Sequence, residues 1–184
     1  MKFKIGKKTI VYEGRFMKVW STEWFDGAGK PQVWEYVEQR DAVLVLPVTD
    51  DQKAVLIKTY RVPIEKYVIE NPAGLVDKMD ENMEDAIKRE LLEEVGYAAA
   101  NVHALPPYPA RPGVSKNVFY PFIATGLKKV ADNTGDDTED ISIMEIPLNK
   151  LFDLWLHPAD DTFIQPDVLA MYQAGIELGI LPRQ

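Results

Sequence analysis

One helix with clear ends most constrains what this chain can fold into. Asn82 is a good N-cap, and Gly96 suits the left-handed turn after a helix, so the sequence predicts a helix from Met83 to Val95. Successive side chains step by about 100° around a helix, which gathers its apolar residues into one stripe. The predicted stripe contains Ile87, Leu91, Leu92 and Val95. The helix should therefore pack against another layer of structure.

Three carboxylates, Glu90, Glu93 and Glu94, share the opposite arc of this helix. Like charges three or four residues apart repel by roughly 0.2 to 0.5 kcal/mol per pair, and the C-terminal end of a helix disfavours acids. A hard cation would remove both costs, because carboxylate oxygens are preferred ligands of magnesium. A solvated helix face would show the same pattern, so the three acids alone leave both interpretations open.

Apolar segments on both sides of the helix predict a mixed fold. Ala42–Val48 and Ala54–Ile57 are typical of buried strands, joined by a turn at residues 50–52. Further strands are predicted at Asn117–Thr125 and Ile141–Ile146, and helices at Leu148–Leu156 and Pro166–Leu178. Trp155 and Leu156 are interpreted as core residues of the first of these helices. Strands and helices mixed in this way favour an α/β sandwich.

The segment from Thr9 to Tyr36 predicts an aromatic-rich antiparallel meander with a turn at residues 26–31. A small sheet alone would expose much of its aromatic surface, so it should pair with the main domain or with a second copy of the chain. We therefore expect two parts, an N-terminal β subdomain at residues 1–38 that serves dimerisation, and a main domain at residues 39–184.

Composition excludes several classes of function. The 184 residues carry a formal net charge of -8, which disfavours a nucleic-acid-binding protein because such proteins rely on clustered lysine and arginine. An acidic protein can still act on a phosphate ester if divalent cations stand between the two. No cysteine is present and the longest apolar run is too short to span a bilayer, so we expect a cytoplasmic protein without a membrane partner.

Read as a string, residues 74–97, GLVDKMDENMEDAIKRELLEEVGY, resemble the Nudix box. The second half matches the box at every fixed position: Arg89, Glu90, Leu91, Glu93, Glu94, Gly96 and Tyr97. The first half is one residue longer than the pattern, so either Asp80 or Glu81 takes the place of the glutamate that pairs with the box arginine. By this resemblance Arg89 and Glu93 belong to the catalytic set, and Glu90, Glu93 and Glu94 bind magnesium.

The resemblance extends to one branch of that superfamily, the ADP-ribose and nucleoside diphosphate sugar pyrophosphatases. The matching stretches are residues 12–16, 45–48, 60–61 and 70–74. It implies a Nudix α/β/α sandwich with an N-terminal antiparallel β-sheet subdomain, assembled as an intertwined homodimer. It also implies that the carbonyl of Ala73 is a further ligand of Mg²⁺, for which Mn²⁺ is a possible substitute.

The same resemblance suggests which residues bind the substrate. Arg61 is expected to contact the diphosphate, with Glu70 nearby in the motif, and Phe16 and Trp34 to sandwich the base from different subunits. A flat aromatic face tolerates any base, although simple packing within the sheet would explain both aromatics equally well. In place of the branch's Ser-Pro-Gly and a later glutamate, this chain has Arg111-Pro112-Gly113 and Asn117. We therefore expect Arg111 to contact substrate and nucleoside diphosphate sugars beyond ADP-ribose to be accepted.

The catalytic base in this branch comes from an acidic loop, which here covers residues 135–140. Glu139 is the first choice, and Asp137, Asp140 and Glu145 are alternatives. Such a base would take a proton from a metal-activated water, while metals and arginine offset charge on the attacked phosphorus.

The predicted function is magnesium-dependent hydrolysis of nucleoside diphosphate sugars or ADP-ribose to a nucleoside monophosphate and a sugar phosphate. A Nudix-fold nucleotide sensor without turnover is the alternative from another class, and a dinucleotide or capped-nucleotide hydrolase is the alternative among enzymes. The complete set of box carboxylates argues against a sensor, because a pure binder has little need for all three.

Overall fold

The structure is a computed structural model that describes residues 3–76, 82–131 and 141–183. Its residues form two compact units, one built from residues 1–41 and 107–119 and the other from residues 42–106 and 120–184. The predicted boundary after residue 38 stays a prediction, and the first packed unit also takes in a segment from the middle of the chain. No helix among the described residues is long and apolar enough to cross a membrane.

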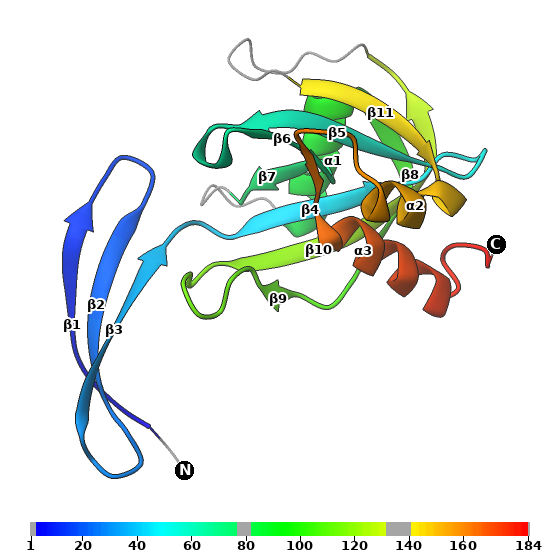
Figure 1. Cartoon of the computed structure of the whole chain (residues 1–184). Helices are drawn as coiled ribbons and strands as arrows, with labels where there is room; N and C mark the ends of the chain where they lie inside the picture. The colour runs from blue at the N-terminus through cyan, green and yellow to red at the C-terminus, as the bar shows by residue number, and fades with distance from the viewer. Residues whose placement is uncertain (1–2, 77–81, 132–140, 184) are drawn as a thin grey trace. The chain divides into compact units, whose positions relative to one another are not determined.

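The first unit is the predicted antiparallel meander. Its strands are β1 (Lys4–Glu13), β2 (Lys18–Phe25) and β3 (Pro31–Glu38), in the order β1-β2-β3 (Figure 1). Asp26 shapes the turn between β2 and β3, because its carboxylate accepts hydrogen bonds of 2.9 Å from the backbone N–H groups of Ala28 and Lys30. The meander and its turn, which the sequence predicted, are thereby confirmed.

The second unit contains two sheets, and one of them is mixed, because β12 pairs with β6 in parallel. One has the order β7-β4-β10-β8, and the other has the order β11-β5-β6-β12. The strands of the first sheet are β4 (Ala42–Pro47), β7 (Ala73–Leu75), β8 (Tyr97–Ala104) and β10 (Val118–Lys129), and the short β9 (Tyr108–Pro109) pairs with the start of β10. The strands of the second are β5 (Lys53–Arg61), β6 (Lys66–Glu70), β11 (Ile141–Pro147) and β12 (Thr162–Ile164). Strand β11, drawn in yellow, forms one edge of that sheet beside β5 (Figure 1).

Helices cover the two sides of these strands. The helices are α1 (Met83–Val95), α2 (Leu151–Leu156) and α3 (Pro166–Glu177), with short 3-10 turns η1 (Val62–Ile64) and η2 (Leu148–Lys150). Alternate residues of β4 and β5 point to opposite sides: Val45 and Val55 pack in the cluster around α1, and Leu46 and Leu56 in the cluster around α2 and α3. Because both faces are covered, β4 is buried throughout. The predicted α/β sandwich is confirmed.

Helix α1 begins and ends where the sequence predicts. The side chain of Asn82 accepts a hydrogen bond from the backbone N–H of Asp85, and Gly96 has a left-handed φ of 73°. The predicted apolar stripe is wrong at one position, because Leu92 is 43% exposed whereas Glu90 is only 8% exposed. The helix is rotated so that its Glu90 side, not its Leu92 side, lies against the neighbouring strand β7.

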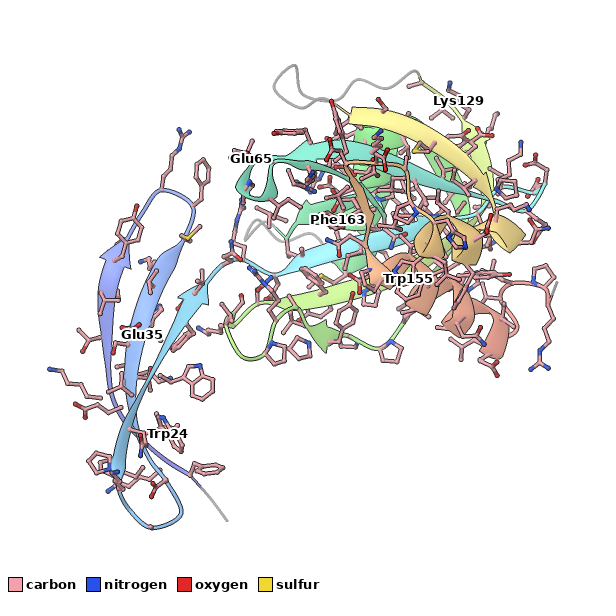
Figure 2. All side chains as sticks on the ribbon, viewed as in Figure 1. Trp24, Glu35, Glu65, Lys129, Trp155 and Phe163 are labelled. Carbon is pink, nitrogen blue, oxygen red and sulfur yellow. The ribbon has the colours of Figure 1, made fainter. Side chains whose placement is uncertain are left out.

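The interpretation of Trp155 and Leu156 as core residues is also wrong. Trp155 (Figure 2) is 39% exposed and Leu156 is 55% exposed. Helix α2 is short, and Leu151 is its buried residue. A helix of this length covers the core with one face only, so the other apolar side chains remain at the surface.

Candidate active site

Glu90 occupies a space that exists because residue 74 is glycine. Strand β7 runs past α1, and a Cβ atom at Gly74 would lie 1.9 Å from both Cδ and Oε1 of Glu90. The glutamate side chain is buried in spite of its charge. A buried carboxylate is costly unless charged or hydrogen-bonding groups compensate it, so its position needs a compensating cation.

Arg89 supplies one such cation. Its Nη1 atom donates to Glu90 Oε1 at 2.7 Å and to Glu93 Oε2 at 3.1 Å, so one guanidinium bridges two of the three carboxylates. Glu93 is more exposed than Glu90. The predicted partners of Arg89, Asp80 and Glu81, lie outside the described residues.

The third carboxylate, Glu94, is turned toward strand β7. Its Oε2 atom accepts a hydrogen bond of 2.9 Å from the backbone N–H of Ala73, which is the first residue of that strand. Two of the carboxylates of α1, Glu90 and Glu94, therefore meet the backbone of β7 at the adjacent residues 74 and 73. The sequence predicted Ala73 and the three glutamates as one metal site. The structure brings Ala73, Glu90 and Glu94 to the junction of α1 and β7, and Arg89 links Glu93 to Glu90.

The donor chemistry of this junction fits a divalent cation. Among the described residues no three acids stand close enough together to form a ready-made ligand group. Arg89 contacts Glu90 and Glu93, and the N–H of Ala73 contacts Glu94. The three side chains predicted as ligands are all carboxylates, the ligand type that magnesium prefers. The tight cradle at Gly74 leaves room for the carboxylate of Glu90 and for no added side chain at residue 74.

Arg61 and Glu70, both predicted to bind substrate, form a pair. Both Nε, at 2.9 Å, and Nη2 of Arg61 donate to the same oxygen, Oε1, of Glu70. Glu70 is buried at the end of β6, whereas the side chain of Arg61 is 48% exposed at the end of β5. The buried carboxylate therefore orients an arginine whose guanidinium still reaches solvent, as a diphosphate contact requires.

The predicted base, Glu139, lies outside the described residues, together with Asp137 and Asp140. The described strand β11 begins directly after that loop, and its first residue, Ile141, lies opposite Thr59 of β5, two residues from Arg61. The fourth alternative, Glu145, is four residues farther along β11, or about 14 Å at the usual strand rise.

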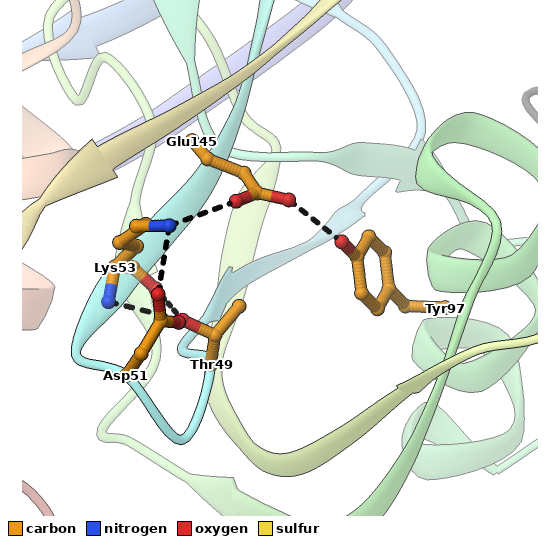
Figure 3. A network of polar contacts seen from close by, with 5 residues as sticks. All are labelled: Thr49, Asp51, Lys53, Tyr97 and Glu145. Atoms are coloured by element: carbon orange, nitrogen blue, oxygen red, sulfur yellow. Dashed lines mark hydrogen bonds and ion pairs between the residues drawn. The ribbon is translucent and has the colours of Figure 1, made fainter.

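Glu145 is already engaged in a network of polar contacts (Figure 3). Its Oε1 accepts a hydrogen bond of 2.9 Å from the hydroxyl of Tyr97, and its Oε2 lies 3.4 Å from Nζ of Lys53. Burial of the Tyr97 ring, and then the hydrogen bond to Glu145, raise the pKa of the Tyr97 phenol. Sequence reasoning did not give Tyr97 this role, because nothing in the sequence shows which strand its hydroxyl meets.

The predicted base-binding aromatics, Phe16 and Trp34, lie in the first unit. Phe16 is 80% exposed in the turn between β1 and β2. Strand β2 begins at Lys18, directly after the turn that carries Phe16. Trp34 lies opposite Thr22, which is four residues farther along β2, or about 14 Å at the usual rise per residue. One chain therefore does not place the two rings on either side of a single base.

Trp34 borders an apolar cavity of about 580 Å³ within the first unit. Its Nε1 donates to the carbonyl of Gly113 at 3.0 Å, and its ring meets Trp24 edge to face at a centroid distance of 6.5 Å. The ring is 51% exposed, so one part of it remains accessible.

The loop that carries Arg111 is held by a buried residue. Asn117 is only 7% exposed, its side chain accepts a hydrogen bond from the hydroxyl of Ser115, and its carbonyl accepts one from the N–H of Ala110. Arg111 is exposed. Asn117 therefore shapes the loop from inside, and Arg111 is the residue of the pair that can meet a ligand.

Known proteins resemble this chain over most of its length. A model of the NUDIX domain matches residues 38–166. Over 148 residues the chain is 30% identical to a methanol dehydrogenase activator of Bacillus methanolicus, covering 80% of each chain. Over 155 residues it is 30% identical to an ADP-ribose pyrophosphatase of Bacillus subtilis, covering 82% of this chain and 83% of that one. A crystal structure of an ADP compounds hydrolase superposes with a TM-score of 0.82 at 26% identity, covering 97% of this chain and 96% of the other.

Proposed function

This chain belongs to the NUDIX domain family, and on that premise we propose that it is a magnesium-dependent hydrolase of ADP-ribose and nucleoside diphosphate sugars. The products are a nucleoside monophosphate and a sugar phosphate. The observation that carries the proposal is the seating of Glu90 at Gly74 beside the contact of Glu94 with Ala73. The names of two similar proteins, an ADP-ribose pyrophosphatase and an ADP compounds hydrolase, support the same class of substrate.

Glu90, Glu93, Glu94 and the backbone carbonyl of Ala73 are the proposed magnesium ligands, and Mn²⁺ is a possible substitute. A bound divalent cation lowers the pKa of water and offsets charge that develops on the phosphoryl oxygens. Arg89 neutralises the same glutamates and holds them in place, as its bonds to Glu90 and Glu93 indicate. We assign Arg89 to the positioning of the metal ligands.

Arg61 is the proposed diphosphate contact, because Glu70 orients a half-exposed guanidinium beside the strand that follows the acidic loop. Phe16 and Trp34 are proposed to stack on the base, and Arg111 to contact the substrate from its exposed loop. Since Phe16 and Trp34 lie well apart along the sheet of one chain, a base between them would need two copies of the protein. A homodimer is therefore part of the proposal.

Glu139 remains the proposed general base, and it would take a proton from the attacking water. Among its alternatives, Glu145 is the least suited, because one of its oxygens accepts a bond from Tyr97 and the other faces Lys53. A cytoplasmic location without nucleic-acid or membrane partners stays a prediction from composition.

A release assay with a panel of substrates tests the proposal. The panel contains ADP-ribose, GDP-mannose, UDP-glucose, NADH and diadenosine polyphosphates, each with magnesium and with a chelator. We expect magnesium-dependent release from ADP-ribose and from at least one GDP- or UDP-sugar. Turnover of ADP-ribose alone would contradict the broader substrate range, and tight binding of these nucleotides without any turnover would favour a sensor.

Two variants of α1 test the metal site in the same assay. Glu93→Gln should lower kcat by roughly 100-fold or more, the scale seen when one electrostatic catalytic group is removed. Glu84→Gln is the matched control, because Glu84 lies in the first turn of the same helix and faces Lys88. Metal-independent activity, or full activity of Glu93→Gln, would overturn the mechanism.

A further inference from the structure

Tyr97 links the end of α1 to strand β11. It follows the helix cap Gly96 directly, its ring is buried in the core cluster around α1, and it is 9% exposed. Its hydroxyl donates a hydrogen bond of 2.9 Å to Oε1 of Glu145 (Figure 3). A hydrogen bond to an ionised carboxylate is stronger than one between neutral groups.

A second set of contacts holds Glu145 from the turn between β4 and β5. Lys53 lies 2.7 Å from Asp51 as well as 3.4 Å from Glu145. Thr49 donates to Asp51 at 2.6 Å and accepts from the backbone N–H of Lys53 at 3.0 Å. The carboxylate that Tyr97 meets thus also faces Lys53, which lies outside both α1 and β11 and is held in turn by Asp51.

Tyr97 joins two elements of the proposed active site: the helix that carries the metal ligands, and the strand that follows the acidic loop. Helix α1 carries Glu93 and Glu94 in its last turns, four and three residues before Tyr97. Strand β11 begins at Ile141, directly after the acidic loop, and as an edge strand it has one neighbour in its sheet, β5. Its position relative to α1 therefore depends on side-chain contacts as well as on the ladder.

We propose that Tyr97 is a positioning residue, which aligns the strand leading out of the acidic loop with the metal-binding helix through its bond to Glu145. The inference rests on the proposed function. In this role Tyr97 acts through Glu145 on strand β11, and not as a catalytic group itself. Because a misplacement of about 1 Å in an active site can cost about 100-fold in rate, we expect a moderate loss when only the hydroxyl is removed.

The test compares Tyr97→Phe with Asp51→Asn, a control at the far end of the same network. Tyr97→Phe should lower kcat by about 3- to 10-fold, while KM and the Kd for Mn²⁺ without nucleotide stay within about twofold, since the metal ligands and Arg61 are untouched. Asp51→Asn keeps the bond between Tyr97 and Glu145 and should leave kcat within about twofold. Hydrogen exchange in residues 141–147 should be faster in Tyr97→Phe than in Asp51→Asn.

Combined variants separate positioning from simple support of the fold. Added to Glu139→Gln, the change Tyr97→Phe should lower kcat little further, because the group it aligns has already been removed. Unchanged kcat in Tyr97→Phe together with a lower Tm would overturn the proposal, as would fully additive effects of the two changes. A loss of more than about 100-fold in Glu145→Gln would also overturn it, because Glu145 would then be the base itself.

The exchange measurement keeps this proposal separate from the proposed function. If the wild-type protein hydrolysed none of the panel substrates, the proposed function would fail. Exchange in residues 141–147 would still report whether the Tyr97 hydroxyl holds β11, and equal exchange in Tyr97→Phe and wild type would overturn the link.

Discussion

Gly74 and Glu90 are in such close contact that residue 74 cannot carry a side chain while the glutamate keeps its position. A Cβ atom there would lie 1.9 Å from two atoms of the Glu90 carboxylate group and 2.5 Å from a third. The glycine of the motif is therefore required here by a charged side chain from the helix that follows it.

The variant Gly74→Ala should displace the side chain of Glu90 from the space beside residue 74. We expect it to lower the free energy of unfolding by about 1 to 3 kcal/mol, the usual cost of overpacking, and to weaken Mn²⁺ binding. Urea unfolding and metal titration measure the two effects. Gly113→Ala is the matched control, because a Cβ there has no neighbour within 4 Å. Wild-type stability and metal affinity in Gly74→Ala would contradict this geometry.

Replacing Arg61 by lysine should weaken substrate binding. Lysine keeps the charge but loses the two-pronged donor that Glu70 orients through Nε and Nη2. We expect KM to rise about tenfold with a smaller change in kcat, the signature of lost ground-state binding. Arg183→Lys, at an exposed arginine that faces Glu177, is the control. Equal KM values for Arg61→Lys and wild type would remove Arg61 from the diphosphate site.

Removing the loop base should reduce the rate without affecting the metal. Glu139→Gln is expected to lower kcat by about 10²- to 10⁴-fold, as loss of a general base does, with an unchanged Kd for Mn²⁺. The acidic limb of the pH dependence of kcat should disappear in the same variant. If Asp137→Asn or Asp140→Asn shows this loss of kcat and Glu139→Gln does not, the base is the aspartate whose variant shows the loss.

The N-cap of α1 should contribute measurably to stability. Asn82→Ala removes the acceptor for the backbone N–H of Asp85, so we expect a loss of about 0.5 to 2 kcal/mol in the free energy of unfolding. Asn149→Ala, at an exposed position in η2, should change it by less than about 0.5 kcal/mol. Equal stability of the two variants in urea would show that the cap contributes nothing.

Alkaline pH should selectively weaken the contact between Tyr97 and Glu145. Because the pKa of Tyr97 is raised in the folded protein, its contribution to stability is complete below the ordinary tyrosine pKa, near 10, and is lost as the pH rises through the folded-state value. The difference in unfolding free energy between wild type and Tyr97→Phe should therefore shrink above about pH 10. Urea unfolding of both proteins from about pH 8 to about pH 11 measures this difference in free energy. A difference that stays constant with pH would contradict a raised pKa of Tyr97.

The parts of the fold that short-range physics controls could be predicted from the sequence. Asn82 and Gly96 mark the ends of α1 because caps involve only the next few backbone groups. The apolar run Ala42–Val48 predicted a buried strand, since a strand covered on both faces has no polar side. The order and spacing of the box residues likewise indicated the helix that carries the proposed metal ligands.

Other features depended on partners distant in the sequence. Nothing local to α1 shows that Glu90 is buried and Leu92 exposed, because the space that Glu90 fills is left by the missing side chain of Gly74 in β7. Trp155 has the composition of a core residue, yet a short α2 buries only one face. The pairing of Arg61 with Glu70 joins residues that are not opposite each other in the ladder, where Glu70 faces Ile57. The bond of Tyr97 to Glu145 joins strands of two different sheets, so the local sequence indicates neither contact.

The three carboxylates of α1 illustrate the difference between what the local sequence determines and what tertiary contacts determine. The sequence by itself determined that Glu90, Glu93 and Glu94 lie on one arc of one helix, because helical periodicity is a property of the local backbone. Only the tertiary structure decided that Glu90 lies against Gly74, that Arg89 contacts both Glu90 and Glu93, and that Glu94 accepts a hydrogen bond from Ala73. The contacts of Glu90 and Glu94 depend on where β7 passes the helix, and that position is set by the packing of the whole second unit.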